Sequence, residues 1–143
     1  MKLDQELAKL LLYAYPDEVE ELIEQGADIN ANNAAGDLAC FYTLSEYRIQ
    51  YIQDYIDLGA DLNKISKRGH NSLRYYISTG GSNMEVIEAL VEHGVDFNLI
   101  YPEGKTILDL LTNGEYYYYN EKYPEVVEYL KEHGAKLSSE LDD

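Results

Sequence analysis

The sequence predicts an all-α protein, a solenoid of about four stacked helix-turn-helix units. A short pattern, in which an apolar helix end is followed by glycine and a polar turn, recurs at Gly26, Gly59, Gly94 and Gly134. These glycines lie 33, 35 and 40 residues apart, and a period of this size is typical of stacked repeats. In three units a second glycine follows after ten residues, at Gly36, Gly69 and Gly104. The turn therefore has a constant length, and the variation falls in the helical part of each repeat.

The first repeat has no turn before it, so we expect it to cap the stack. Its first helix is expected over residues 3–15, where the leucines form one broad apolar face. Pro16 breaks this helix, and Asp17 is expected to cap a second helix. That second helix should end at Gly26, because a left-handed residue is easiest for glycine.

We expect the constant turns to project as fingers, which span residues 31–35, 64–68 and 99–103. Helices should follow them near residues 38–45 and 48–58, 72–78 and 83–93, and from about 106 and over 124–133. A single domain over residues 1–143 is predicted, with repeats at about 3–30, 31–63, 64–98 and 99–137 and an acidic tail at 138–143.

The run from Gly104 to Leu111, Gly-Lys-Thr-Ile-Leu-Asp-Leu-Leu, resembles the Thr-Pro-Leu-His-x-Ala signature that opens an ankyrin repeat. The run from Gly69 to Tyr76 is a weaker match, and Gly36 to Thr43 keeps little beyond glycine and apolar character. The Gly-Ala-Asp-Ile/Leu-Asn turns at Gly26 and Gly59 match closely. From about Leu3 to Leu137 the chain is thus similar to the ankyrin-repeat family. The resemblance implies β-turn fingers, paired antiparallel helices, and a concave side formed by fingers and first helices.

The formal net charge of −16 argues against a nucleic-acid partner, because phosphate contacts need clustered Lys and Arg. It permits the opposite role, imitation of nucleic acid toward a protein that binds it. No run of eighteen apolar residues and no secretory signal are found, so no membrane partner is expected. The single cysteine, Cys40, has no partner for an internal disulfide, fits a reducing compartment and should be a buried core residue. We therefore expect a cytoplasmic protein, and a monomer.

No catalytic, metal-binding or cofactor-binding arrangement is visible, and the chain is not predicted to be an enzyme. The histidines are not spaced as zinc ligands, and the pair Gly80-Gly81 lacks the lysine of a phosphate loop. His93 and His133 each precede a helix-ending glycine, where histidine suits the negative end of the helix dipole. His70 lies in a finger and is expected to be exposed or to contact a partner.

Acidic residues are concentrated on the second helices, with runs at 17–24, 85–92 and 121–132. Two interpretations stay open. These carboxylates are a solvated face that keeps the protein soluble, or they are an acidic stripe that occupies a basic groove on a target.

Tyrosine is unusually frequent, with fifteen residues against two phenylalanines and no tryptophan. Tyr51, Tyr55 and Tyr129 fall at packing positions of the repeat. Seven of the others are candidates for a binding surface, since tyrosine combines a large rigid ring with a polar tip. These candidates are Tyr42 and Tyr75 on the concave side, Tyr101 in a finger, and Tyr116, Tyr117, Tyr118 and Tyr119, which cannot all point into a core. Alternatively, half of the tyrosines cover the last helix pair.

Basic residues cluster around the second finger, at Lys64, Lys67, Arg68, His70 and Arg74. They either contact an acidic partner or offset neighbouring carboxylates. We predict that the chain binds another protein as a stoichiometric inhibitor or immunity-type partner, with a nucleic-acid-binding enzyme or defence nuclease, whose basic surface it covers, as the expected kind of target. The alternative is a passive scaffold in which charge serves solubility only. The composition is compatible with a bacterial or phage source.

Overall fold

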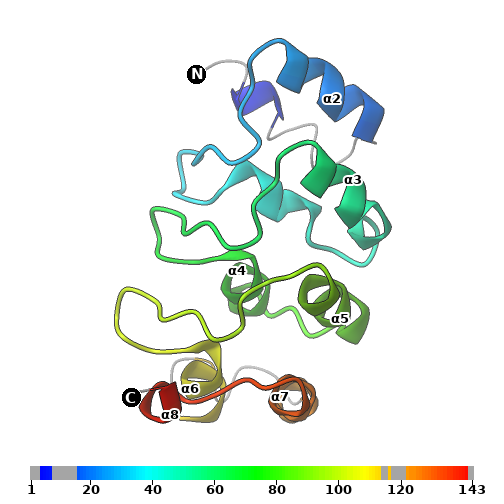
Figure 1. Ribbon diagram of the computed structural model, residues 1–143. Coiled ribbons are helices and arrows are strands. Elements are labelled where there is room, and N and C mark those ends of the chain that lie inside the picture. Colours follow the sequence, from blue (N-terminus) through cyan, green and yellow to red (C-terminus); the bar gives the residue numbers. More distant parts are fainter. Residues whose placement is uncertain (1–3, 8–15, 114–115, 117–121, 142–143) are drawn as a thin grey trace. The chain divides into compact units, whose positions relative to one another are not determined.

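The computed structural model describes residues 4–7, 16–113, 116 and 122–141. Within these residues the regular structure is helical (Figure 1). β structure among them is confined to an isolated antiparallel bridge between Asn32 and Leu38. This confirms the predicted all-α repeat fold. The chain divides into two compact units, Met1–Ser72 and Leu73–Asp143, and the extent of a single domain stays a prediction.

The second helix of every repeat ends in the same way, at a glycine. The N–H of Gly26 donates to the carbonyl of Ile23 at 2.9 Å, and the N–H of Ala27 donates to the carbonyl of Leu22 at 3.1 Å. These two bonds form a Schellman motif, which requires a left-handed residue, and φ at Gly26 is +105°. The same pair of bonds ends the other three second helices at Gly59, Gly94 and Gly134. The predicted helix stops are confirmed.

In the first unit, residues 4–7 are helical and α2 spans Pro16–Glu24. α2 begins one residue before the expected cap Asp17, because the fixed φ and missing N–H of proline suit the first turn of a helix. Asp17 instead lies exposed inside that turn, where a carboxylate favours the positive end of the dipole. The rest of the helix expected over residues 3–15 lies outside the described residues.

The second repeat forms tighter helices than expected. Its first helix is the 3₁₀ segment η1 (Ala39–Thr43), and its second consists of η2 (Ile49–Tyr51) followed by α3 (Ile52–Asp57). Leu38 stands at the N-cap of η1 and offers no side-chain acceptor to the first turn. Without a cap, an α-helix of this length is poorly stabilised.

The helices of the second unit lie close to the predicted bounds, and Figure 1 shows α6 and α7 side by side. They are α4 (Ser72–Ser78), which begins at the boundary of the units, α5 (Met84–Glu92), α6 (Ile107–Thr112), α7 (Tyr123–Glu132) and α8 (Ser138–Leu141). The side chain of Asn83 caps α5, and Thr106 and Asp109 form a capping box at α6. The short helix α8 was not expected in the polar tail.

Asparagines at the end of the recurrent turn join successive repeats inside each unit. In the first unit, the side-chain amide of Asn30 donates to the carbonyl of Gly59 at 2.6 Å, and its oxygen accepts from the N–H of Asp61 at 2.9 Å. In the second unit, Asn98 makes the same two bonds to Gly134 and Lys136, at 3.2 and 2.8 Å. Each asparagine therefore fixes the spacing between two consecutive turns.

The cores of the units contain the apolar residues that the repeat pattern predicts. Cys40 is 3% exposed, and burial together with the charge of Asp61 raises the pKa of its thiol to about 12. Tyr55 is buried as predicted, whereas Tyr51 and Tyr129 are half-buried. His93 and His133 cap their helices as predicted, with each Nδ1 within 2.9 Å of a carbonyl one turn back.

Candidate functional site

The three fingers share one backbone design. In each, an N–H donates to the carbonyl four residues on, and the glycine N–H donates back across the tip. These bonds measure 2.8 to 3.0 Å and join Asn33 to Asp37 and Gly36, Ser66 to His70 and Gly69, and Tyr101 to Lys105 and Gly104. The fingers are therefore defined turns that differ in their side chains.

In the first unit, the second finger is bonded to the first. The N–H of Lys67 donates to the side-chain oxygen of Asn32 at 2.8 Å, and the N–H of Arg68 donates to the carbonyl of Gly36 at 3.3 Å. The guanidinium of Arg68 lies 3.3 Å from the carboxylate of Asp37. Both basic side chains are exposed, so the backbone is held while the charges reach solvent.

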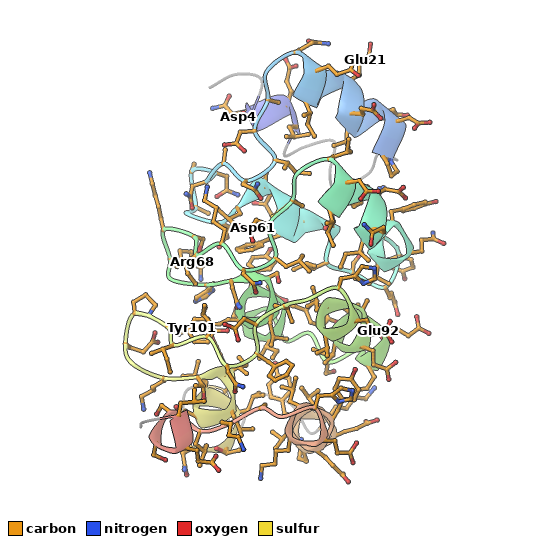
Figure 2. The ribbon with its side chains drawn as sticks, in the orientation of Figure 1. Asp4, Glu21, Asp61, Arg68, Glu92 and Tyr101 are labelled. Carbon is orange, nitrogen blue, oxygen red and sulfur yellow. The ribbon has the colours of Figure 1, made fainter. Side chains whose placement is uncertain are left out.

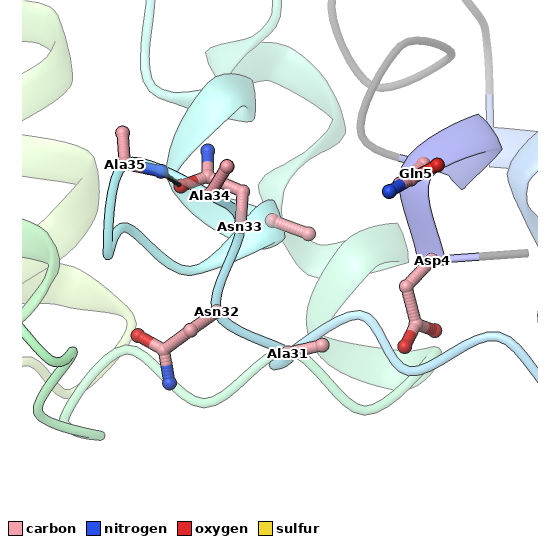
Figure 3. Close-up of a pocket in the computed structure, with 8 residues that line it drawn as sticks. Asp4, Gln5, Ala31, Asn32, Asn33, Ala34 and Ala35 are labelled. Atoms are coloured by element: carbon pink, nitrogen blue, oxygen red, sulfur yellow. Dashed lines mark hydrogen bonds between the residues drawn. The ribbon is translucent and has the colours of Figure 1, made fainter. Parts of the chain in front are cut away.

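A hollow of about 590 Å³ lies beside the first finger (Figure 3). Asp4 and Gln5 form one wall, and the other is lined by Ala31, Asn32, Asn33, Ala34, Ala35 and Ala39. The small side chains leave this space, and the lining offers amides and one carboxylate. The side-chain oxygen of Asp4 already accepts from the N–H of Asp28 at 2.7 Å. The hollow therefore presents little reactive chemistry.

In the second unit, Arg74 joins the third finger to α4. Its guanidinium makes two parallel bonds to Glu103, at 2.8 and 2.6 Å, and its Nε donates to the hydroxyl of Tyr116 at 3.2 Å. The guanidinium carbon lies 4.8 Å from the ring centroid of Tyr101 and 5.9 Å from that of Tyr116. Arg74, Tyr101 and Tyr116 are buried. These three predicted contact residues therefore form an internal cluster that supports the finger from beneath.

The electrostatics of this cluster favour the charged arginine. Burial opposes the charge of Arg74, but the bonds to Glu103 and Tyr116 outweigh it and raise the pKa of the guanidinium. Burial also raises the pKa of Tyr101, and the nearby Arg74 charge only partly offsets this. The cluster thus keeps a cation over the ring of Tyr101.

The predicted contact residues fall into four groups in the structure. Lys67 and Arg68 are exposed, Tyr42 and Tyr75 are half-buried, and Tyr101, Tyr116, His70 and Arg74 are buried. Tyr117, Tyr118 and Tyr119 lie outside the described residues. A binding role for each of them stays a prediction.

His70 is buried, whereas the sequence predicted that it would be exposed or would contact a partner. Its backbone closes the second finger, its carbonyl accepting from Ser66 and its N–H donating to the Ser66 hydroxyl oxygen at 3.3 Å. These bonds hold the residue at the base of the finger, where its side chain is buried.

Besides Leu141, which is 38% exposed near the end of the described chain, two more strongly exposed apolar side chains of the described residues were not among the predicted contacts. Tyr47 is 78% exposed in the connection between η1 and η2, and Ile100 is 50% exposed in the third finger. Their positions in the sequence could have identified them as exposed, since an apolar residue in a connection or finger lies outside the helix-packing pattern. Ile100 stands directly before the buried Tyr101, so the finger that the cluster supports presents an apolar side chain.

The carboxylates of the second helices are exposed. Figure 2 shows Glu92 of α5 and Tyr101 of the third finger on opposite sides of the second unit. Among the described residues, the ion pairs found within 4.0 Å are Arg68–Asp37 and Arg74–Glu103, and neither involves these helices. The exposed set comprises Asp17, Glu18, Glu20, Glu21, Glu24, Glu85, Glu88, Glu92, Glu125, Glu128 and Glu132.

The described helices are all too short, or too polar, to cross a bilayer. Within the same residues, no three histidine, cysteine or acidic side chains gather as a metal site would require.

No protein-family model matches the chain. Over 98 residues, 64% of its length, it is 33% identical to "Ankyrin repeat and SOCS box protein 6" of Pongo abelii and 32% identical to that of Homo sapiens. Over 104 residues, 68% of its length, it is 33% identical to "Putative ankyrin repeat protein R598" of Acanthamoeba polyphaga mimivirus. The chain spans 23% of the length of the first two relatives and 31% of the third.

Proposed function

Since this chain is built of ankyrin repeats, we propose that it binds another protein and acts as a stoichiometric inhibitor or immunity-type partner. Its target would be a nucleic-acid-binding enzyme, such as a defence nuclease, whose basic surface it covers. Inhibition of this kind works by occupancy, without turnover. A bacterial or phage source stays a prediction, because the relatives above come from primates and an amoeba virus.

The observation that carries this proposal is the exposure of eleven carboxylates, five on α2 in the first unit and six on α5 and α7 in the second, none of which forms an ion pair with another described residue. A solvated surface normally mixes both signs of charge. Here carboxylates recur at three- and four-residue spacing along each helix, as at Glu85, Glu88 and Glu92.

Like charges at this spacing destabilise a helix by about 0.2–0.5 kcal/mol per pair. A basic surface would relieve this repulsion on binding. The negative electrostatic potential of these carboxylates would also attract a basic surface from a distance and so raise the association rate. The arrangement therefore costs stability in the free chain and favours a cationic partner.

The experiment measures association with a partner captured from the native host and identified by mass spectrometry. Glu85, Glu88 and Glu92 are changed together to glutamine, and the matched control changes three exposed residues of other chemistry, Gln50, Gln53 and Ser139, to alanine. We expect the glutamine variant to associate more slowly than the control, and the rate of the unchanged chain to fall as salt increases. Activity of the captured enzyme should fall to zero at one chain per enzyme.

A passive scaffold is the second candidate, and the exposed apolar Ile100 of the third finger favours it. An apolar contact would give association rates that hardly change with salt or with the glutamine substitutions. A captured partner that keeps its full activity at saturation would also overturn inhibition in favour of the scaffold.

A further inference from the structure

We propose that the tips of the first and second fingers bind an acidic segment of a protein partner. One carboxylate of that segment is held by the guanidinium of Arg68, and a neighbouring one lies near the ammonium of Lys67. This ligand has the opposite charge to the basic surface proposed above, so the inference goes beyond the proposed function. Both residues belong to the described part of the first unit.

The second finger is basic in a chain that is otherwise strongly acidic. The chain has 27 Asp and Glu residues, yet none occurs from Leu62 to Met84 or from Ile29 to Gly36. The residue before the finger glycine is Ala35 in the first finger, Arg68 in the second and Glu103 in the third. All three fingers keep the same backbone bonds, so the turn does not require a basic residue at this position.

The guanidinium of Arg68 has one edge available for a carboxylate. Its Nη1 lies 3.3 and 3.5 Å from the carboxylate oxygens of Asp37, whereas the bonds between Arg74 and Glu103 measure 2.8 and 2.6 Å. Charge-assisted bonds are usually about 2.7–2.9 Å long, so Asp37 holds Arg68 loosely. Among the described residues, Nε and Nη2 of Arg68 form no hydrogen bond, and 51% of the side chain is exposed.

The first finger fixes the backbone beneath both basic side chains. The N–H of Lys67 donates to the side-chain oxygen of Asn32, and the N–H of Arg68 donates to the carbonyl of Gly36. A Cβ on Gly36 would lie 3.0 Å from Cγ of Arg68 and 3.5 Å from Cβ of Lys67, so both stems lie against this glycine. The adjacent tip, Ala34-Ala35, is exposed, small and uncharged. A partner would therefore meet ordered donors, which lowers the cost of binding.

The net charge of −16 does not exclude such a contact. At 0.1 M salt, exposed charges more than about 10 Å apart are largely screened, so the nearest groups decide what binds. Residues 31–37 and 64–70 contain three lysines and arginines and one carboxylate, the buried Asp37. Asp61, just before the finger, already accepts from the N–H of Asn63 at 2.9 Å. Figure 2 shows Arg68 well apart from the acidic Glu21 of α2.

The test is a titration of the isotope-labelled full-length chain with an end-capped peptide of four glutamates, followed by NMR. A peptide of four glutamines is the control ligand. The signals are the backbone N–H groups of Lys67 and Arg68 and the Nε–H of Arg68, one of three arginines in the chain. The variants are Arg68→Met and Arg68→Lys. Lys105→Met is the matched control, because it removes one exposed positive charge beside the third finger.

We expect saturable shifts with the glutamate peptide and none with the glutamine peptide. Arg68→Met should raise the Kd of the glutamate peptide by about fivefold or more, through loss of a two-point contact. Arg68→Lys should raise it by a smaller factor, because lysine keeps the charge and lacks the planar fork. Lys105→Met should leave the Kd within about twofold of the unchanged chain.

The proposal is overturned if no shift saturates through the millimolar range, or if the glutamine peptide gives the same shifts. It also fails if Arg68→Lys binds as tightly as the unchanged chain, because the fork is then not used. Equal weakening by Lys105→Met and Arg68→Met would mean that the peptide responds to overall charge.

A second copy of the chain also carries exposed carboxylates. Shifts at Arg68 that grow with chain concentration in the absence of peptide would therefore overturn a partner's segment as the occupant. These measurements do not involve the carboxylates of the second helices. Either proposal can thus fail while the other stands.

Discussion

The turn asparagine Asn30 offers a direct test of how successive repeats are held together. Replacing it by alanine removes two hydrogen bonds, to the carbonyl of Gly59 and from the N–H of Asp61, at 2.6 and 2.9 Å. Each such bond contributes about 0.5–1.5 kcal/mol net. Because Asn30 is half-buried and water replaces part of the loss, we expect unfolding to require about 1–2 kcal/mol less free energy. For a chain of this length, that lowers Tm by roughly 2–8 °C.

The assay is urea unfolding followed by far-ultraviolet circular dichroism, with thermal unfolding as a second measurement. Asn113→Ala is the control, since Asn113 is an exposed asparagine at the C-cap of α6 and its backbone N–H donates to the carbonyl of Asp109 at 3.0 Å. The control should change stability by less than about 0.5 kcal/mol. If Asn30→Ala behaves like the control, the side-chain bonds between turns do not stabilise the first unit and our reasoning is wrong.

Three further predictions concern the second unit and the tyrosine segment. Leu108→Ala should cost about 2–5 kcal/mol of unfolding free energy in urea, as for other buried leucines; a change under about 0.5 kcal/mol would place Leu108 on the surface. Changing Tyr117 and Tyr118 together to alanine should weaken partner binding in a titration and leave Tm nearly unchanged, whereas a collapse of the fold would show a core role. Burial would raise the pKa of Asp109, but bonds from Thr106 and Ser138 outweigh it and lower the pKa. The resulting stability is therefore present above the ordinary carboxyl pKa and lost as pH falls through the lowered value, and Asp109→Asn should flatten this acid dependence in urea titrations at successive pH values.

Local signals in the sequence predicted the helices that have their own caps and stops. The bounds of α4 match the expected 72–78, and α5 and α6 begin after Asn83 and Thr106, whose side chains cap them. The 3₁₀ form of η1 was not predicted, because helical periodicity does not distinguish it from an α-helix. One indication of it was present in the sequence, because Leu38 at the N-cap position has no side-chain acceptor for the first turn of the helix.

The candidate site was predicted less well than the fold, because burial of its residues depends on partners far along the chain. Tyr101 and Tyr116 were expected at a surface from their places in a finger and a tyrosine run. They are buried by stacking around Arg74, a contact across 42 residues in the case of Tyr116 that no local pattern contains. The resemblance to ankyrin repeats implied that the acidic second helices face outward, and the structure shows their described carboxylates exposed.

Cys40 is the only cysteine of the chain and it is buried, so its chemical reactivity can report transient opening of the first unit. Alkylating reagents attack the thiolate, and Cys40 is both enclosed and held protonated by a pKa of about 12. Reaction at neutral pH must therefore wait for the first unit to open. The rate of alkylation, measured by mass spectrometry, would report how often the first unit opens, without an added probe. This rate should decrease if a bound partner stabilises the closed form of the first unit.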